Sequence, residues 1–230
     1  MQETNKYRHE LKYKINYGDY LSLRQRLKVF MQSDEHSDNN GRYVIRSIYF
    51  DNIDDKALRE KVYGFPKREK FRIRYYNDDF SFITLEKKIK YNNLCMKFSA
   101  QITEEECRAI LSGDTGFMKL HTSQLVRELF FKMKSQQLRP RVLVSYIREP
   151  FVFSAGNVRV TFDSDIRTTL FHGSFLEKDL RDISALDNAA DIILEVKYDE
   201  FIPDIILHLI QTENIRQQAY SKYGACRRFG

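Results

Sequence analysis

The sequence predicts a single α+β domain over residues 1–230, in which about eight strands are surrounded by peripheral helices. Three observations support this fold class. The aromatic residues are 17 Phe and 14 Tyr with no Trp, which favours a β-rich protein. Hydrophobic residues make up 42% of the chain, which is a globular composition, and 230 residues suffice for one core. No linker or low-complexity segment separates a second domain.

Hydrophobic periodicity assigns the elements. We expect strands at residues 7–16, 43–50, 68–76, 80–90, 141–149, 151–155, 157–163 and 192–198. We expect helices at residues 17–31, 54–62, 104–113, 122–136 and 203–223, the third of which opens with a capping box at Thr103 to Glu106. Residues 33–41 are predicted to form a loop, and residues 77–79 and 155–157 are predicted to form turns between strands.

Several of these strands alternate charged residues instead of apolar ones. The pattern Glu-x-Lys occurs three times, as Glu10-Leu11-Lys12, Glu86-Lys87-Lys88 and Glu195-Val196-Lys197. A strand sends residues i, i+2 and i+4 to one face, so each copy presents an acid and a base on the same side. Two further strands repeat the idea with Arg72-Ile73-Arg74 and Tyr146-Ile147-Arg148.

The opposite faces of these strands are mainly apolar, as Phe71, Leu85 and Leu194 illustrate, and need a covering layer of helices. Burial of unpaired charge is very costly, so the charged faces cannot form an ordinary packed core. Two arrangements remain open from the residues alone. Either the charged faces point to solvent, or the sheet closes into a barrel whose lumen holds water and ligand.

The net charge of +6 indicates an anionic partner. A triphosphate or polyphosphate needs many donors from several directions, which neighbouring strands would supply through Lys12, Arg72, Arg74, Lys88, Arg148 and Lys197. Mg²⁺ or Mn²⁺ needs only one or two carboxylates when phosphate oxygens and waters complete its shell. The candidate metal ligands are Glu10, Glu86 and Glu195.

An ordered set of short motifs then resembles a known family. These motifs are Tyr7–Lys14, Ser47–Asp51, Arg72–Tyr75, Leu85–Lys88, Ser145–Arg148, Arg159–Asp163, Leu194–Lys197 and Ser221–Tyr223. Each is weak alone, but the ordered set resembles the VTC domain, the catalytic domain of the vacuolar transporter chaperone polyphosphate polymerases. That family lies within the triphosphate tunnel metalloenzyme, or CYTH-like, superfamily.

The resemblance implies a closed antiparallel β-barrel that forms a basic tunnel with helices outside. It also implies transfer of the γ-phosphoryl group of ATP to a growing polyphosphate chain, with Mn²⁺ or Mg²⁺. By position, Lys12, Arg72, Arg74, Lys88 and Arg148 resemble the family's phosphate-binding bases. Tyr146 resembles the tunnel tyrosine, Glu195 the metal-binding glutamate, and Ser221 with Lys222 the C-terminal phosphate contacts.

The first strand separates branches of this superfamily. Hydrolytic and cyclase-type members carry Glu-x-Glu-x-Lys there, where this chain has Glu10-x-Lys12-x-Lys14. A lysine in place of a carboxylate removes a metal ligand and adds a phosphate contact, which favours the VTC branch. A tripolyphosphate or nucleoside triphosphate hydrolase of the same fold remains an alternative, as does a non-enzymatic module that binds RNA or polyphosphate.

The expected partners are ATP and polyphosphate or triphosphate. Nucleic acid is not expected, because carboxylates beside the bases repel a phosphate backbone unless metal intervenes. No apolar run reaches the ~20 residues of a membrane span and no signal peptide is visible, so we expect a cytoplasmic protein, with room for a membrane-associated partner protein. Cys95, Cys107 and Cys226 are expected to be free thiols, and the five scattered histidines are expected to be surface or packing residues.

Overall fold

The computed structural model describes residues 6–34, 37–38, 40–92, 94–169, 174–188, 190–212 and 216–229. Within these residues, one antiparallel sheet of ten strands is combined with six α-helices, so the fold is α+β. Part of the predicted loop at 33–41, and two of the histidines, His36 and His172, lie outside the described residues.

Eight strands pair in the order β1-β10-β8-β7-β3-β4-β5-β6. Their bounds are β1 His9–Ile15, β3 Tyr43–Asp51, β4 Lys67–Tyr76, β5 Asp79–Tyr91, β6 Leu94–Ile102, β7 Arg139–Phe153, β8 Val158–Thr169 and β10 Ile192–Tyr198. Two short strands lie off this path: β2, Gln32–Ser33, pairs with β7, and β9, Ile183–Ser184, pairs with β8.

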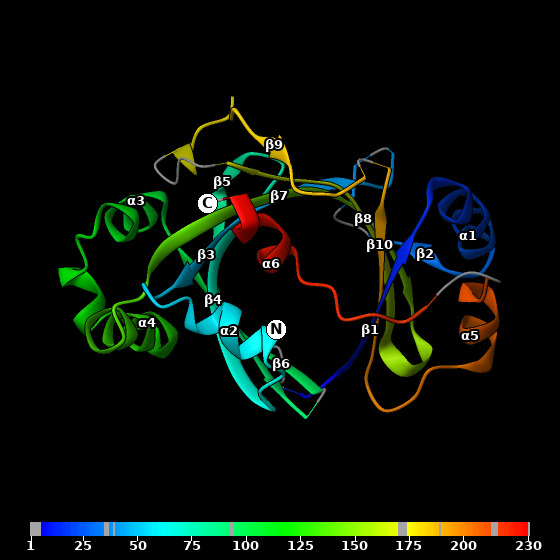
Figure 1. Cartoon of the computed structure of the whole chain (residues 1–230), viewed down its shortest axis with the longest axis horizontal. Helices are drawn as coiled ribbons and strands as arrows, with labels where there is room; N and C mark the ends of the chain where they lie inside the picture. The colour runs from blue at the N-terminus through cyan, green and yellow to red at the C-terminus, as the bar shows by residue number, and fades with distance from the viewer. Residues whose placement is uncertain are drawn as a thin grey trace.

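The sheet curves until its two end strands approach each other, as Figure 1 shows. An isolated antiparallel bridge joins Arg8, just before β1, to Cys95 on β6. The amide of Arg8 donates to the carbonyl of Cys95 at 2.8 Å, and the amide of Cys95 donates to the carbonyl of Arg8 at 2.9 Å. No ladder continues this bridge in the described part of the chain, so a closed barrel is not confirmed.

Two pairs of helices cover the outer face of the sheet on opposite sides (Figure 1). Helices α3, Glu104–Ser112, and α4, Gln124–Ser135, supply Ile110, Leu129 and other side chains to a core that includes Phe71 and Leu85. Helices α1, Tyr17–Phe30, and α5, Asp204–Ile210, pack with Leu194 and Phe162 in a second core. The apolar strand faces are therefore covered by helices, as the sequence predicts.

The capping box predicts the start of α3 correctly. Thr103 Oγ1 accepts from the amide of Glu106 at 3.2 Å, and the amide of Thr103 donates to Glu106 Oε2 at 2.9 Å. The reciprocal bonds satisfy two amides that the first turn of a helix leaves without partners. Gly113 ends the helix in the left-handed region with φ +88.

A third apolar cluster lies on the face of the sheet opposite to α1, α3, α4 and α5. Helix α6, Lys222–Cys226, places Tyr223 and Cys226 against Val142, Val144 and Ile166 on β7 and β8. The Tyr223 hydroxyl donates to Asp51 at the end of β3. Asp51 also accepts from the amide of Ala57 in helix α2, Lys56–Val62, so this carboxylate ties α6 to α2.

Two sequence predictions about strands are wrong. Strand β6 was not predicted, because its sequence, LCMKFSAQI, lacks a clear alternation. Residues 141–149 and 151–155 form one long strand, β7, although Pro150 suggests a break. Pairing with β3 ends at Arg148 and pairing with β2 begins at Phe151, so Pro150 faces no strand on that side and costs no ladder bond there.

The predicted helix at 203–223 is also wrong in part. Helix α5 ends at Ile210, and residues 216–221 are not helical. Tyr13 forms a bridge with Gln217, and the amide of Gln218 donates to the carbonyl of Lys12 at 2.9 Å. Bonding to β1 replaces helical bonding here, and the segment leads to α6 (Figure 1). Short 3-10 turns complete the chain at Gly116–Leu120, Ala155–Asn157 and Arg227–Phe229.

The remaining sequence expectations concern thiols, histidines and membrane spans. All three cysteines are buried free thiols, as predicted. His9 stacks on Tyr198 at 4.8 Å between ring centroids, and His121 Nε2 lies 3.1 Å from Glu106, which are packing and surface contacts. Among the described residues, no helix has the length and apolar character needed to traverse a bilayer.

The turn between β7 and β8 contains a glycine that tertiary contact restricts. Gly156 has φ +71, and an added Cβ would lie 2.5 Å from the carbonyl oxygen of Phe201. Gly64 has φ +70 but no heavy atom within 4 Å of such a Cβ.

We expect Gly64→Ala to lower the free energy of unfolding by roughly 1 kcal/mol, and Gly156→Ala to lower it by at least about 1 kcal/mol more. Urea unfolding measures both, and equal losses would contradict the close contact.

Candidate functional site

The charged strand positions share one face of the sheet. In an antiparallel pair, residues directly opposite each other point to the same side. The opposite pairs include Lys12–Glu195, Glu10–Lys197, Arg148–Asp163, Arg72–Glu86 and Lys70–Lys88. Arg74 and Tyr146 share this face because each lies two residues from a member of the set. We call this side of the sheet the inner face.

Ion pairing shows that the inner face is concave. Lys88 Nζ on β5 lies 2.6 Å from Glu10 Oε1 on β1. These strands are the seventh and the first in the pairing order, so only strong curvature brings them together. Glu86, Glu195 and Arg148 are 2%, 3% and 6% exposed, respectively. The alternative in which the charged faces point to solvent is therefore wrong.

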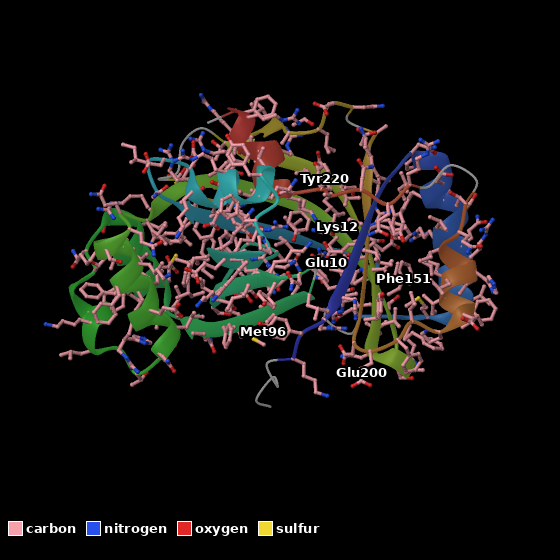
Figure 2. The ribbon with its side chains drawn as sticks, turned by 60° about the horizontal axis from the view of Figure 1, so that its bottom comes forward. Glu10, Lys12, Met96, Phe151, Glu200 and Tyr220 are labelled. Carbon is pink, nitrogen blue, oxygen red and sulfur yellow. The ribbon has the colours of Figure 1, made fainter. Side chains whose placement is uncertain are left out.

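Lys12 lies between two carboxylates in this interior. Its Nζ is 3.3 Å from Glu195 Oε2 and 3.8 Å from Glu10 Oε1, and Lys197 Nζ is 2.5 Å from Glu195 Oε1. Figure 2 shows Glu10 and Lys12 side by side on β1, with Tyr220 nearby. Lys12 Nζ also lies 3.5 Å from the carbonyl oxygen of Tyr220.

The pKa values of these groups follow from burial and from their partners. Burial raises the pKa of Glu10, but Lys12 and Lys88 outweigh it and bring the value to about 2. Burial also opposes ionisation of Glu195, yet Lys197 and Lys12 hold its pKa well below the ordinary value. Lys12 has a raised pKa because the two carboxylates overcome its burial. Glu10, Glu195 and Lys12 are therefore all charged at neutral pH.

Glu86 organises the two arginines of β4. Arg72 Nε donates to Glu86 Oε2 at 2.9 Å, and Arg74 Nη2 lies 2.8 Å from Oε1. Arg72 Nη1 also donates to the Tyr49 hydroxyl at 2.9 Å. Because arginines engage both oxygens of Glu86, this carboxylate is better placed to orient Arg72 and Arg74 than to hold a metal ion.

Arg148 forms a bidentate pair with a fully buried carboxylate that the sequence reasoning did not select. Arg148 Nε and Nη2 lie 2.6 and 2.7 Å from the two oxygens of Asp163, which also pairs with Lys222. Lys222 Nζ and Arg148 Cζ lie 4.7 and 5.4 Å from the centre of the Tyr146 ring. Burial raises the pKa of Tyr146 to about 12, so its hydroxyl stays protonated.

Ser221 and Lys222 are neighbours in the C-terminal segment, but their side chains differ in function. Ser221 Oγ caps α6 by accepting from the amide of Gly224 at 3.2 Å. Lys222 is buried and turned toward Asp163. The sequence motif therefore combines a helix cap with an interior base.

Lys70 is a second inner-face residue that the sequence reasoning missed. It continues the alternation of Arg72 and Arg74, and this signal could have identified it. Its Nζ lies 4.6 Å from the centre of the Tyr223 ring, and no carboxylate forms an ion pair with it in the part of the chain that the structure describes. Burial and the nearby charges of Lys12 and Arg68 lower its pKa to about 7.

The donors near Lys12 are compatible with a hard divalent cation. Glu10 and Glu195 offer carboxylate oxygens, and the buried Thr161 Oγ1 opposite Glu195 has no hydrogen-bond partner among the residues that the structure describes. Buried polar atoms are normally satisfied, so this oxygen is available to a ligand or its shell. No group of three or more His, Cys, Asp or Glu side chains could hold a metal ion within the described ranges. A cation here would thus depend on phosphate oxygens, as Mg²⁺ commonly does.

A comparison with protein families now adds to this geometry. The family model of the VTC domain matches residues 7–229 of the chain. The chain belongs to the VTC domain family. This match confirms the resemblance of the ordered strand motifs, and it covers every inner-face residue described above. A comparison with curated protein sequences finds no match.

Solved structures share the fold of this VTC domain at low sequence identity. An adenylyl cyclase candidate from Hippeastrum, described as having a dominant triphosphatase activity, has a TM-score of 0.59 and 12% identity, with 96% of this chain and 95% of that chain covered. An adenylate cyclase candidate from Bacillus halodurans has a TM-score of 0.50 and 13% identity, with 84% and 81% covered. At these identities the likeness concerns the fold alone.

The Asp163 cluster leads to a stability prediction. Asp163→Asn leaves Arg148 and Lys222 buried without their countercharge, so we expect the free energy of unfolding to fall by about 3 kcal/mol or more. The exposed pair of Asp187 with Arg228 at 3.1 Å provides the control, since Asp187→Asn should change stability by less than about 0.5 kcal/mol. Chemical denaturation of both variants measures the difference, and a loss for Asp163→Asn as small as the control's would contradict the assignment.

Lys70 leads to a prediction about pH. Because its pKa is about 7 in the folded protein and ordinary in the unfolded chain, the unfolded state binds more protons above neutral pH. Lys70 therefore lowers the free energy of unfolding by its full amount below about pH 7. This loss of stability fades as the pH rises toward about 10.

We expect Lys70→Met to stabilise the protein most near pH 6, with a gain that shrinks near pH 9, in urea unfolding at both pH values. The exposed Lys119→Met serves as the control and should give the same difference at both. A gain for Lys70→Met that is independent of pH would exclude this electrostatic account.

Proposed function

We propose that this VTC domain is a metal-dependent polyphosphate polymerase, which transfers the γ-phosphoryl group of ATP to the end of a growing polyphosphate chain. The observation that carries the proposal is the position of Lys12 on the inner face, between Glu10 and Glu195. The family match over residues 7–229 supports it further. In this proposal the curved sheet, bridged at Arg8 and Cys95, encloses a basic tunnel.

The proposed reaction depends on position and charge. A terminal phosphate oxygen of the acceptor chain attacks the γ-phosphorus of ATP, a new phosphorus–oxygen bond forms, and the bond to the departing ADP breaks. The acceptor phosphate is already an anion, so no general base has to remove a proton from it. Phosphoryl transfer of this kind is accelerated mainly by in-line alignment and charge neutralisation.

The proposed phosphate-binding side chains surround this alignment from several strands. Arg72 and Arg74, oriented by Glu86, offer guanidinium forks for bidentate contact, and Arg148 offers a third from β7. Lys12, Lys88, Lys197 and Lys222 act as point charges, with Tyr146 and Ser221 as hydroxyl donors. Each of these seven bases pairs with a carboxylate, so an incoming phosphate replaces or joins an existing counterion.

Glu195, with Glu10 beside it, is the proposed holder of Mg²⁺ or Mn²⁺. The bound ion would supply charge neutralisation on the transferring phosphates. Lysines keep both carboxylates ionised, since Lys197 and Lys12 lower the pKa of Glu195, and Lys12 and Lys88 lower the pKa of Glu10. The two acids can therefore meet a cation without first losing a proton.

A hydrolase that cleaves triphosphates is the second candidate. The triphosphatase activity described for the Hippeastrum protein of similar fold favours it. In such an enzyme water takes the place of the acceptor phosphate, and the same bases bind the substrate. Lys12 opposes this alternative, because it stands where the hydrolytic pattern places a second carboxylate.

The products formed from ATP and Mn²⁺ by the purified protein distinguish the two candidates. We expect long-chain polyphosphate and ADP, resolved by gel electrophoresis and by ³¹P NMR. Free phosphate without polymer would replace the polymerase proposal with the hydrolase.

Glu195→Gln should reduce turnover by roughly 10²-fold or more, because it removes a charge used at the reaction centre. The exposed Glu200→Gln is the matched control, since Glu200 follows the same strand and lies apart from Glu10 and Lys12 in Figure 2. Similar turnover by both variants would remove Glu195 from the proposed site.

A further inference from the structure

Two groups of cations at the inner face differ in their partners. The bases of the proposed reaction centre form ion pairs with carboxylates: Lys12, Arg72, Arg74, Lys88, Arg148, Lys197 and Lys222. Lys61, Arg68, Lys70 and Lys90 form no such pair within the residues that the structure describes. We call these four residues the unpaired cluster.

The unpaired cluster is assembled by the pairing of β4 with β5 and by α2. Arg68 lies directly opposite Lys90, and Lys70 lies directly opposite Lys88, so like charges face each other in two successive pairs. Lys61 reaches the cluster from α2, with its Nζ 3.4 Å from the carbonyl oxygen of Ala219. Like charges directly opposite each other destabilise a sheet, so folding alone does not favour this arrangement.

The electrostatic effect of this crowding appears in the pKa values. Burial lowers the pKa of Lys61, and the charges of Arg68, Lys12 and Lys90 lower it further. Burial, Arg68 and Lys88 likewise lower the pKa of Lys90, although Cys95 and Glu10 oppose them. The neighbouring charges at Lys61 are therefore repulsive, whereas Lys90 experiences both repulsion from Arg68 and Lys88 and attraction from Cys95 and Glu10.

The neighbouring acids are already engaged by other groups. Asp51, the carboxylate that most favours charged Lys70, accepts from the amide of Ala57 and from the Tyr223 hydroxyl. Glu10 is held by Lys88 through both oxygens, at 2.6 and 2.8 Å. No acid among the described residues forms a direct ion pair with the cluster, although Asp51 and Glu10 attract it from a distance, so an anionic ligand would supply a direct countercharge.

The position of the cluster identifies the class of ligand. Lys70 is adjacent to Lys88 across the β4–β5 pair and is repelled by Lys12, so the cluster is continuous with the proposed reaction centre. Arg68 lies two residues further along β4, about 7 Å away. A row of cations that starts at the centre and extends away from it suits an extended chain of phosphates better than a single phosphate ion.

We propose that Lys61, Arg68, Lys70 and Lys90 form a subsite for the phosphates of a polyphosphate chain that do not react. The proposal rests on the proposed function and adds a location for the chain beyond the triphosphate. It implies that long chains gain affinity from these residues, whereas tripolyphosphate, which fills only the centre, gains little.

Binding of tripolyphosphate and of long-chain polyphosphate, measured without ATP by isothermal titration calorimetry, tests the subsite. We expect Arg68→Ala/Lys90→Ala to weaken long-chain binding by roughly tenfold or more, since each lost contact is charge-assisted. The affinity for tripolyphosphate should change much less. The matched control is Lys28→Ala/Lys119→Ala, which removes the same charge from exposed positions outside the inner face.

Each alternative result has a distinct meaning. Equal weakening by the two double variants would show a non-specific charge effect and overturn the subsite. Parallel loss of both ligands with Arg68→Ala/Lys90→Ala would assign these residues to the reaction centre and also overturn it. Tighter binding of a single-stranded RNA than of polyphosphate would replace the proposed ligand.

The proposed function can fail separately, since a protein that only hydrolyses ATP can still show this difference in chain binding. Loss of the fold in the double variant is detected by thermal unfolding, where relief of repulsion should leave the melting temperature unchanged or higher. If it falls, the single variant Lys90→Ala provides the same binding comparison, with the same expected preference for loss of the long chain.

Discussion

The ion pair of Lys88 with Glu10 joins β1, the first strand of the sheet, to β5, the last but one, and the rest of the interior depends on the same kind of charge compensation. Buried charges are tolerated only when they are paired and hydrogen-bonded. The register places an acid opposite or beside each base of the centre, as with Lys12 and Glu195 or Arg148 and Asp163. Curvature then brings these pairs within reach of one another across the interior.

This compensation explains how the interior can be strongly basic and still fold. The inner-face acids are ionised, because the surrounding bases hold the pKa values of Glu10, Glu195 and Asp163 below their ordinary range. Each acid also fixes the direction of its bases, most clearly where Glu86 engages Arg72 and Arg74. An anionic ligand therefore meets oriented donors, and their reorganisation energy is low.

Ligands are expected where a polar or charged group of the interior lacks a partner. Within the described residues, Thr161 Oγ1 and Ser47 Oγ are buried on the inner face without hydrogen-bond partners, and the partly exposed Lys70 forms no ion pair with an acid. Such groups lower the stability of the folded protein by themselves. These three groups share the inner face with bases that resemble phosphate contacts, which favours a ligand-binding interior.

Much of the site could be predicted from the sequence, because strand periodicity is a local property. The alternation at Glu10–Lys12, Arg72–Arg74 and Glu195–Lys197 assigned these residues to one face of each strand before any pairing was known. The same alternation extends to Lys70, so its place on the inner face also follows from the strand period. The capping box of α3 and the turn at residues 155–157 were also predicted from local sequence alone.

Asp163 illustrates what local sequence could not reveal, since its importance depends on a base of β7 and another of α6 that are distant in the chain. The break predicted at Pro150 and the long helix predicted at 203–223 failed for the same reason, because neighbouring strands supplied or removed the decisive hydrogen bonds. The sequence by itself determined which residues share a face of each strand, through a period of two residues. Only the tertiary structure decided that these faces turn inward and neutralise one another, because register and curvature depend on pairing between distant segments.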